Sequence, residues 1–445
     1  MSKRIVVLGG AESGTGAAVL AKLQGFDVFL SDMSKIAPAF INTLNDYGIA
    51  FEQGQHTADL ICNATEIIKS PGIPNKAPII QQIIALQIPI ISEIEFASRY
   101  TNAKMIAITG TNGKTTTTLL TYHLLKNAGL NVGLAGNVGN SFAMQVATKK
   151  FDYYVLELSS FMLDDMFDFK ADIAILTNIT PDHLDRYDYQ MQKYVNSKFR
   201  ITQNQTASDY FIYCKDDEVI QAALASQQID STMIPFSIAE DLAYGASISN
   251  QHLNIKLKQN TFTMTIQELA LQGKHNLYNS MASGVAAKLL DIRNETLKES
   301  MSDFKNAPHR LEHVARIQGI EFINDSKATN VNATWFALES INTPIIWIAG
   351  GVDKGNDYSM LTQLVKDRVR AIVCLGTDNS KIHEAFGNVV DIIVNTASAT
   401  EAAEVSYHLG KKGDTVLLSP ACASFDLFKN YEDRGQQFID AVKEL

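Results

Sequence analysis

The stretch TGTNGKTT at residues 109–116 constrains the chain most, because its composition and spacing suit a phosphate-bearing ligand. The apolar run at residues 105–108 predicts a buried parallel strand directly before it, and residues 115–128 predict a helix that ends at Gly129. A glycine turn between a strand and a helix points backbone N–H groups and the positive end of the helix toward phosphates. We therefore predict that this loop binds a nucleoside triphosphate.

Separate roles are expected for the residues of this loop. Gly110 and Gly113 allow the backbone to curl, Lys114 supplies a positive charge to the β- and γ-phosphates, and the Thr115 hydroxyl is suited to bind Mg²⁺. The other loop residues expected to contact the phosphates are Thr111, Asn112 and Thr116. The loop is a shortened G-x-x-G-K-T-T form, because an apolar residue stands where the longer G-x-x-x-x-G-K-[ST] pattern has its first glycine. A glycine turn that binds nothing is the alternative.

The length of 445 residues exceeds what one hydrophobic core usually supports, so we expect three domains. Changes in pattern place them at residues 1–92, 93–306 and 307–445. Hydrophobic residues make up 46% and charged residues 19% of the chain, which is typical of a packed globular protein.

Charge and hydropathy patterns exclude several classes of protein. The net charge is −10 and no block rich in Lys and Arg occurs, so we expect no nucleic-acid partner. No apolar run reaches the roughly 18 residues of a membrane span, and the N-terminus lacks the apolar segment of a secretion signal. The four cysteines form no C-x-x-C pair, which argues against zinc and against a disulfide framework. We expect a cytoplasmic protein.

The first domain begins as a βαβ nucleotide-binding unit. Residues 4–8 predict a strand, residues 9–16 (GGAESGTG) a glycine-rich turn, residues 17–25 a helix, and residues 27–30 a second strand that leads to Asp32. The turn lacks the G-x-G-x-x-G spacing of a dinucleotide site, so NAD and FAD are not expected. Backbone N–H groups at a helix N-terminus, with Asp32 as an acceptor, suit a UDP-type diphosphate instead. Alternatively, the glycines only allow close packing of helix on strand.

Polar residues follow several predicted strands of the central domain. Those at or just beyond the carboxyl end of a strand are Asn137, Glu157, Asn178, Asp182 and His183. In open α/β sheets ligands bind at these ends, so the side chains can converge near the phosphates. Carboxylate and imidazole groups there suit a divalent metal, and Mg²⁺ prefers oxygen ligands. As alternatives, Glu157 or Asp182 caps a helix and His183 is a structural histidine.

Two further features complete the central domain. Lys198 lies on a predicted helix that starts near Tyr189, and its spacing alone indicates a solvated surface residue. The alternating pattern at residues 248–266 predicts antiparallel strands attached to the α/β sheet.

The third domain carries three predicted strands, at residues 321–323, 345–349 and 415–418, that each end in polar residues. In open α/β sheets ligands bind at the carboxyl ends of the strands, so by this carboxyl-end rule we expect these residues to lie on one face. That face is rich in donors, as a small dicarboxylate needs, and it comprises Lys327, Thr329, Lys354, Ser419 and Ser424. Asp325 is expected to hold a ribose. Helix N-capping is the alternative for Asp325, Thr329 and Ser424.

The motifs of the whole chain, taken together, resemble those of the Mur ligase family of peptidoglycan synthesis. They are TGTNGKTT, GNVG, LELSSF, TNITPDHLDRY, NSKFRI, KHNLYN, HRLE, NDSKATN, GGVDKG and SPACASFDLFKNYEDRG, and they occur in the order expected for the family. NDSKATN and SPACASFD are similar to the D-glutamate-adding member. The D-[ND]-P-R motif of the members that add meso-diaminopimelate or lysine is not found in the sequence.

This resemblance implies a fold and an activity. The fold is α/β with three domains: an N-terminal Rossmann-like domain, a central phosphate-loop ATPase-type α/β domain with antiparallel strands added, and a C-terminal Rossmann-like domain. The activity is an ATP-dependent amide ligation that adds D-glutamate to UDP-N-acetylmuramoyl-L-alanine through an acyl phosphate. The implied partners are these small molecules, and the implied state is a monomer.

The resemblance also implies roles for residues of the reaction centre. Lys114, Glu157, His183, Lys198 and Arg310 would be catalytic. Two Mg²⁺ ions are implied, with Thr115 and Glu157 on one and His183 with Lys198 on the other, Lys198 being carbamylated. Asn276, Arg310 and Asp325 would bind the adenine, phosphate and ribose of ATP.

The two remaining substrates are assigned in the same way. The UDP-sugar would contact Ser13, Asp32, Ser34, Gly72, Asn137 and His183. D-Glutamate would contact Thr329, Lys354, Ser424, Phe425 and Tyr431. Ser34 and the GGAESGTG turn depart from the pattern of better-known members, which leaves the uridine contacts open.

Two other classes of function remain as alternatives. One is a related ligase with a different acceptor, such as another Mur ligase or a folylpolyglutamate synthase-like enzyme. The other is a non-catalytic module that binds a nucleotide sugar, which the presence of Lys114, Thr115, Glu157 and His183 disfavours.

Overall fold

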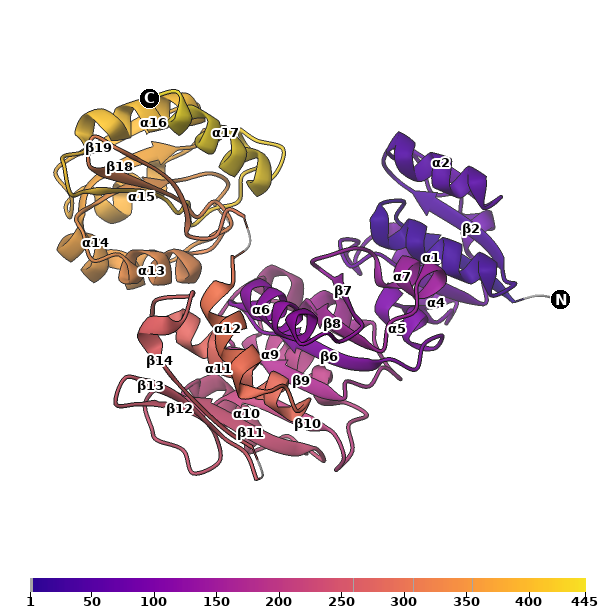
Figure 1. The fold of residues 1–445 in the computed structure, drawn as a ribbon. Coiled ribbons are helices and arrows are strands. Elements are labelled where there is room, and N and C mark those ends of the chain that lie inside the picture. Colours follow the sequence, from indigo (N-terminus) through magenta and orange to yellow (C-terminus); the bar gives the residue numbers. More distant parts are fainter. Residues whose placement is uncertain (1–2, 259, 307, 354) are drawn as a thin grey trace. The chain divides into compact units, whose positions relative to one another are not determined.

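The computed structural model describes residues 3–258, 260–306, 308–353 and 355–445. The chain forms two compact units, the first made of Met1–Leu271 with Asn276–Phe304 and the second of Gln272–His275 with Lys305–Leu445. Two β-sheets belong to the first unit and one to the second (Figure 1). Within the described residues, every helix is too short or too polar to span a lipid bilayer.

The first sheet has five parallel strands in the order β3-β2-β1-β4-β5. They are β1 (Arg4–Leu8), β2 (Asp27–Asp32), β3 (Ala50–Gln53), β4 (Glu66–Lys69) and β5 (Ile90–Ile91). The helices of this part are α1 (Glu12–Leu23), α2 (Pro38–Asp46), α3 (Ala58–Ile61), α4 (Pro78–Ala85) and α5 (Glu93–Ser98). Because β1 lies between β2 and β4, the segments that follow these three strands meet at one edge of the sheet.

Helix α1 begins at Glu12, inside the segment predicted to be a glycine-rich turn. Gly14 and Gly16 are therefore helical residues. A Cβ atom on Gly14 would lie 1.8 Å from the carbonyl oxygen of Gly9, and one on Gly16 would lie 2.0 Å from the hydroxyl oxygen of Ser141. Gly14 thus allows close packing of the helix on the first strand, as the alternative supposes, and Gly16 allows the close approach of Ser141. The predicted helix start is wrong because glycine spacing does not distinguish a turn from a tightly packed helix.

The second sheet has nine strands in the order β14-β13-β12-β11-β10-β9-β6-β8-β7. They are β6 (Lys104–Thr109), β7 (Val132–Gly136), β8 (Tyr153–Glu157), β9 (Ile173–Leu176), β10 (Tyr210–Cys214), β11 (Thr232–Ser237), β12 (Gly245–Ser249), β13 (His252–Lys256) and β14 (Thr261–Thr265). The pairs β12-β13 and β13-β14 are antiparallel and the other neighbours are parallel, which confirms the predicted antiparallel addition.

Helices, most of them labelled in Figure 1, and short 3₁₀ turns lie between these strands or follow the last of them. The helices are α6 (Lys114–Asn127), α7 (Phe142–Thr148), α8 (Ser160–Asp164), α9 (Met191–Phe199), α10 (Glu218–Leu224), α11 (Lys274–Leu289) and α12 (Asn294–Asp303). The 3₁₀ turns are η1 (Leu184–Tyr187), η2 (Arg200–Thr202) and η3 (Ile266–Glu268).

The second unit contains a six-stranded sheet in the order β15-β16-β20-β17-β18-β19, parallel except for the pair β15-β16. Its strands are β15 (Glu312–Ile317), β16 (Ile320–Asn324), β17 (Ile345–Ala349), β18 (Val369–Leu375), β19 (Ile393–Thr396) and β20 (Thr415–Leu418). Its helices are α13 (Val331–Ser340), η4 (Ser359–Leu361), α14 (Thr362–Arg368), α15 (Ser380–Phe386), α16 (Ala399–Leu409) and α17 (Tyr431–Lys443).

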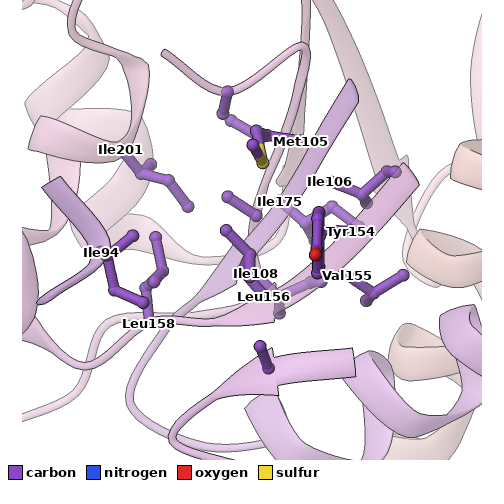
Figure 2. Packing of buried hydrophobic residues seen from close by; sticks show 14 of the residues in the cluster. Ile94, Met105, Ile106, Ile108, Tyr154, Val155, Leu156, Leu158, Ile175 and Ile201 are labelled. Atoms are coloured by element: carbon purple, nitrogen blue, oxygen red, sulfur yellow. The ribbon is translucent and has the colours of Figure 1, made fainter. Parts of the chain in front are cut away.

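Apolar side chains pack on both faces of the sheets. In the first unit one continuous core includes residues of the first and the second sheet. Figure 2 shows part of it, including Ile94 of α5 and the strand residues Ile108 and Leu156. The strand that carries the phosphate loop is therefore anchored in the largest core of the molecule. The three sheets confirm the predicted three-part α/β architecture, while the boundaries after residues 92 and 306 stay a prediction.

Candidate active site

The predicted phosphate loop connects β6 to α6. Gly113 is the N-cap residue of α6 and has a φ of 79°, and Gly110 has a φ of 147°. A Cβ atom on Gly110 would lie 1.9 Å from Oγ1 of Thr177, and one on Gly113 would lie 2.4 Å from Oδ1 of Asn279. Both positions therefore require glycine, because of backbone conformation and because of neighbouring side chains.

The segment after β9 holds this loop in place. The N–H of Thr111 donates to the carbonyl of Asn178 at 2.9 Å, and the N–H of Asn112 donates to Oδ1 of Asn178 at 2.9 Å. The Thr177 hydroxyl donates to the carbonyl of Asn112 at 2.7 Å. Asn178 does reach the loop, as the sequence predicts, and its contacts there are to the loop backbone.

Two lysines meet at the first glycine of the loop. Nζ of Lys114 donates to the carbonyls of Gly110 and Thr111 at 2.9 and 2.8 Å, and Nζ of Lys198 donates to the carbonyl of Gly110 at 2.7 Å. Lys198 is only 1% exposed, and its Nζ lies 4.6 Å from the ring centroid of Tyr194. The interpretation of Lys198 as a surface residue is wrong, because α9 turns this side of its surface toward the core.

Burial lowers the pKa of Lys198 well below its usual value, and the positive charge of Lys114 lowers it further. The carboxylates of Asp182 and Asp164 act in the opposite direction. Lys198 therefore combines a weakly basic amine with a cationic neighbour.

Glu157 ends β8 beside the loop and is 1% exposed. Its Oε1 accepts a hydrogen bond of 3.0 Å from Nδ2 of Asn137, while its Oε2 has no hydrogen-bond partner among the described residues. Glu157 does not cap α8, because the side chain of Ser159 does so. A buried carboxylate oxygen without a donor is costly unless a cation binds it.

A cavity of about 320 Å³ gathers three of the residues predicted to be catalytic together with other predicted site residues, but Glu157 is not among its lining residues. Lys114, Asn137, Asp182, His183 and Lys198 line it. His183 has a left-handed backbone conformation, with a φ of 51°, and precedes η1. The structure thus brings together residues from four separate segments of the second sheet, as the carboxyl-end rule predicts.

Arg186 also lines this cavity, although the sequence did not predict it as a site residue. Its Nη2 donates to the carbonyl of Gly72 at 3.0 Å, and its guanidinium lies 4.6 Å from the ring centroid of Phe161. Arg186 stands three residues after His183 in the quoted TNITPDHLDRY motif, so the motif contained it, but spacing alone gave it no role.

The residues in the cavity and beside it fit a hard divalent cation only in part. No group of three or more His, Cys, Asp or Glu side chains suited to a metal occurs among the residues that the structure describes. The buried hydroxyl of Thr115 and the unpartnered Oε2 of Glu157 are oxygen donors of the kind that Mg²⁺ prefers. Mg²⁺ usually retains several waters and binds substrate phosphates, so a small set of protein ligands suits it. Nζ of Lys198 donates to the carbonyl of Gly110, and an unmodified amine nitrogen is not the oxygen ligand that Mg²⁺ prefers.

A second, larger cavity of about 630 Å³ lies at the edge of the first sheet where β1, β2 and β4 end. Asp32, Ser34 and Gly72 line it, and Gly72 also lines the smaller cavity. The Asp32 carboxylate accepts from the N–H of Gly10 at 2.6 Å and from the N–H of Ser34 at 2.7 Å. Of the residues predicted for the UDP-sugar, Ser13 does not line either cavity, and its hydroxyl bonds to the buried Glu93.

Helix α11 contributes to the surroundings of the phosphate loop. Asn276 is buried and its Oδ1 accepts from Nδ2 of Asn279 at 3.1 Å. Oδ1 of Asn279 accepts from the hydroxyl of Thr117 on α6 at 3.1 Å. Asn279 belongs to the KHNLYN motif, and its place beside Gly113 was not predicted.

The second unit places the predicted ribose contact in a buried network. The Asp325 carboxyl accepts from the N–H of Leu311 at 3.2 Å and from the Ser419 hydroxyl at 2.9 Å. Burial raises the pKa of Asp325 to about 7, against the opposing effect of Arg310. Asp325 does not cap a helix, and neither does Thr329, since α13 is capped by Asn330.

The residues predicted for D-glutamate differ in exposure. Ser424 is buried, and no helix starts after it, so its capping alternative is wrong. Phe425 is 71% exposed, and Tyr431 begins α17 with Nζ of Lys327 lying 5.3 Å from its ring centroid. Lys354 lies outside the described residues.

Comparisons with known proteins place the chain in a family. The sequence profile of the "Mur ligase MurD-like, N-terminal domain" matches residues 3–92, that of the "Mur ligase middle domain" matches residues 108–287, and that of the "Mur ligase, glutamate ligase domain" matches residues 309–422. The chain belongs to the Mur ligase family. The resemblance seen in the motifs is thereby confirmed.

This Mur ligase is similar in sequence to relatives that are named as D-glutamate ligases. A UDP-N-acetylmuramoylalanine--D-glutamate ligase of Bacteroides fragilis is 55% identical over 444 residues, covering 100% of both chains. One of Christiangramia forsetii is 54% identical over 445 residues, again covering 100% of both.

Solved structures of more distant proteins share the fold of this Mur ligase. A UDP-N-acetylmuramate-alanine ligase from Thermotoga maritima has a TM-score of 0.63 at 19% identity, with 100% of each chain covered. A MurF ligase from the same organism, in complex with ADP, has a TM-score of 0.63 at 14% identity, with 94% of each chain covered. At this identity the likeness concerns the fold alone.

Proposed function

We propose that this Mur ligase joins D-glutamate to the L-alanyl carboxylate of UDP-N-acetylmuramoyl-L-alanine, with cleavage of ATP, in the synthesis of a peptidoglycan precursor. Relatives that carry the name of this activity are 53–55% identical over the whole chain. The structural observation that carries the proposal is the cavity holding Lys114, His183 and Lys198, which adjoins the larger cavity of the first sheet at Gly72. A carboxylate delivered from the first sheet would thus reach the phosphate loop.

The reaction needs ATP because a carboxylate is a poor electrophile at neutral pH. A carboxylate oxygen attacks the γ-phosphorus, the bond from that phosphorus to the bridging oxygen breaks, and ADP leaves with the electron pair. The resulting acyl phosphate is then attacked at its acyl carbon by the neutral amine of D-glutamate. Phosphate leaves, the nitrogen loses a proton, and an amide remains.

Lys114 would stabilise the charge that develops during phosphoryl transfer. Its ammonium group now donates to two carbonyls of its own loop. A phosphate anion is a stronger acceptor than a neutral carbonyl, so Lys114 would turn to the γ-phosphate when ATP binds. Arg310 would add a second positive charge, with Asn276 and Asp325 holding the adenosine. The other backbone N–H groups of the loop would hold the remaining phosphate oxygens, since those of Thr111 and Asn112 donate to Asn178.

Mg²⁺ would be held by Thr115 and Glu157, and a second ion by His183 together with Lys198. Bound Mg²⁺ neutralises phosphate charge and thereby reduces repulsion of the attacking carboxylate. The buried Oε2 of Glu157 supports the first assignment, because it has no partner among the described residues.

Lys198 would become a metal ligand by carbamylation. Its lowered pKa favours the neutral amine, which can attack the carbon of CO₂, lose a proton and form an anionic carbamate. The positive charge of the nearby Lys114, which opposes an ammonium at Lys198, would stabilise a carbamate there. The modification would therefore place an anion, in place of a neutral amine, beside the positive charge of Lys114.

The remaining substrate contacts follow the same proposal. The UDP-sugar would contact Asp32, Ser34, Gly72, Asn137 and His183, and Ser13 would take part only through the helix N-terminus. D-Glutamate would contact Thr329, Lys354, Ser424, Phe425 and Tyr431. Domains of residues 1–92, 93–306 and 307–445, a monomeric state and a cytoplasmic location complete the proposal. Phosphate release with the nucleotide sugar and a panel of amino acids tests it.

A further inference from the structure

The larger cavity contains a polar side chain that none of the proposed contacts uses. His56 follows β3, is half-buried, and lines the cavity together with Asp32 and Ser34. Most of the other lining residues are apolar or glycine. A polar group in such a wall fixes the orientation of a ligand and supplies specificity.

The imidazole of His56 is held by a chain of hydrogen bonds. Nδ1 of His56 lies 2.7 Å from the hydroxyl oxygen of Ser31, and that hydroxyl lies 2.8 Å from Oε1 of Glu52. Glu52 is held in turn by the N–H and the hydroxyl of Thr57 at 2.8 and 2.6 Å. Although burial raises the pKa of Glu52, these hydrogen bonds lower it below its usual value, so Glu52 is a carboxylate at neutral pH.

These hydrogen bonds determine which ring nitrogen of His56 carries the hydrogen. A carboxylate can only accept, so the single hydroxyl hydrogen of Ser31 points to Glu52. The Ser31 oxygen is then an acceptor toward His56, which requires the hydrogen on Nδ1. In a neutral imidazole the other nitrogen, Nε2, consequently presents a lone pair. No hydrogen bond to Nε2 of His56 occurs within residues 3–258, 260–306, 308–353 and 355–445.

His56 is suited to a neutral group and not to a phosphate. Burial lowers the pKa of its imidazole, while the Glu52 and Asp32 carboxylates raise it less, so the ring is neutral at pH 7. A lone pair beside two carboxylates repels an anionic diphosphate. The phosphates are better served by the N-terminus of α1 itself, since the N–H groups of Gly9 and Gly10 already donate to Ser31 and Asp32. We therefore expect the base of the nucleotide, and not its phosphates, to bind at the end of the cavity where His56 lies.

We propose that His56 selects uracil in the nucleotide substrate, with Nε2 accepting the hydrogen of the imide N3–H and with Ser31 and Glu52 fixing the tautomer. The inference rests on the proposed function, because that function supplies a uridine nucleotide to this cavity. Uracil has a hydrogen on N3, whereas cytosine has a lone pair there. Cytosine would therefore place two acceptors against each other and leave both without a donor. Ser31 and Glu52 are positioning residues, since they act through His56.

Calorimetric titration of the full-length protein with UDP, CDP and N3-methyl-UDP tests this assignment. We expect UDP to bind roughly tenfold to a hundredfold more tightly than either analogue, because a polar group in the wall of the site then lacks its partner. In His56→Ala the three affinities should lie within about threefold of one another. In His56→Gln, whose amide oxygen can accept, part of the preference should return. His252→Ala, a histidine change on β13, serves as the control and should keep the wild-type ratio.

Ser31→Ala separates tautomer control from simple packing. This variant keeps the imidazole but frees Nδ1, so the preference for UDP over CDP should fall even though His56 remains. An unchanged preference in Ser31→Ala, or in both His56 variants, would overturn the inference. If the wild-type protein binds UDP and CDP equally, the inference fails while the ligase activity stands. If UDP does not bind at all, the proposed function fails with it.

Discussion

The side-chain nitrogen of Lys198 lies 2.7 Å from the carbonyl oxygen of Gly110, so a buried lysine holds the first glycine of the phosphate loop. The same carbonyl accepts from Lys114 at 2.9 Å. Burial and the positive charge of Lys114 both lower the pKa of Lys198, so the ammonium form of Lys198 is disfavoured here. Formation of a carbamate at Lys198, as proposed above, would replace the disfavoured ammonium by an anion beside Lys114.

Lys114→Ala is expected to lower kcat by roughly 10²- to 10³-fold, because one positive group facing the transferred phosphate is lost. Phosphate release under saturating substrates measures the effect. Lys126→Ala is the matched control, since Lys126 is an exposed lysine near the end of the same helix. Turnover of Lys114→Ala close to that of the control would contradict the role of Lys114.

Lys198→Ala is expected to lose activity to a similar degree, and short-chain carboxylic acids should restore part of it. A small carboxylate can occupy the space of the missing carbamate and supply the oxygen ligands. Assays with and without acetate or propionate measure the rescue. Mass spectrometry of the native protein gives an independent readout, because carbamylation adds the mass of CO₂; an unmodified Lys198 in fully active enzyme would exclude this role.

Gly113→Ala is expected to weaken binding of an ATP analogue and to lower Tm more than Gly129→Ala does. Both glycines have a φ of 79°, so backbone strain of about 1–2 kcal/mol is common to both. A Cβ atom at Gly113 would lie 2.4 Å from Asn279, whereas nothing lies within 4 Å of one at Gly129. The difference between the variants thus isolates the contact with Asn279, and equal losses would show that this contact is unimportant.

Asp325→Asn is expected to remove a pH dependence of stability. Because the pKa of Asp325 is raised from 3.8 to about 7, the wild-type carboxyl contributes most below pH 4, and this contribution is lost as pH rises toward 7. The Tm of the wild type minus that of the variant should therefore increase as pH falls from 7 to 4. The exposed Asp367→Asn serves as the control. An increase of this difference with rising pH would reverse the predicted sign.

The strands and the phosphate loop were predictable because their signals are local. Apolar runs mark β6, β8 and β9, and Gly110 with Gly113 marks the turn. The position of β6 between β8 and β9 then brings Glu157 and His183 beside the loop, and the carboxyl-end rule anticipates this arrangement.

What the sequence reasoning missed depends on contacts between distant segments. The local sequence around Lys198 does not indicate that its side chain is buried. The burial results from packing of α9 against the phosphate loop. Arg186 bonds to Gly72 across 114 positions of the chain, and His56 takes its orientation from Ser31 on a neighbouring strand. The start of α1 was misplaced because Gly14 and Gly16 are required by packing partners that the local sequence does not reveal.

The most direct test of the proposed function measures phosphate release from ATP with UDP-N-acetylmuramoyl-L-alanine and one amino acid at a time. The account predicts rapid release with D-glutamate and little with L-glutamate, L-alanine or L-lysine, together with formation of an amide product. Preference for another amino acid would identify a different ligase of this family. Absence of ADP formation with all of them, while the nucleotide sugar still binds, would contradict the assignment as an enzyme.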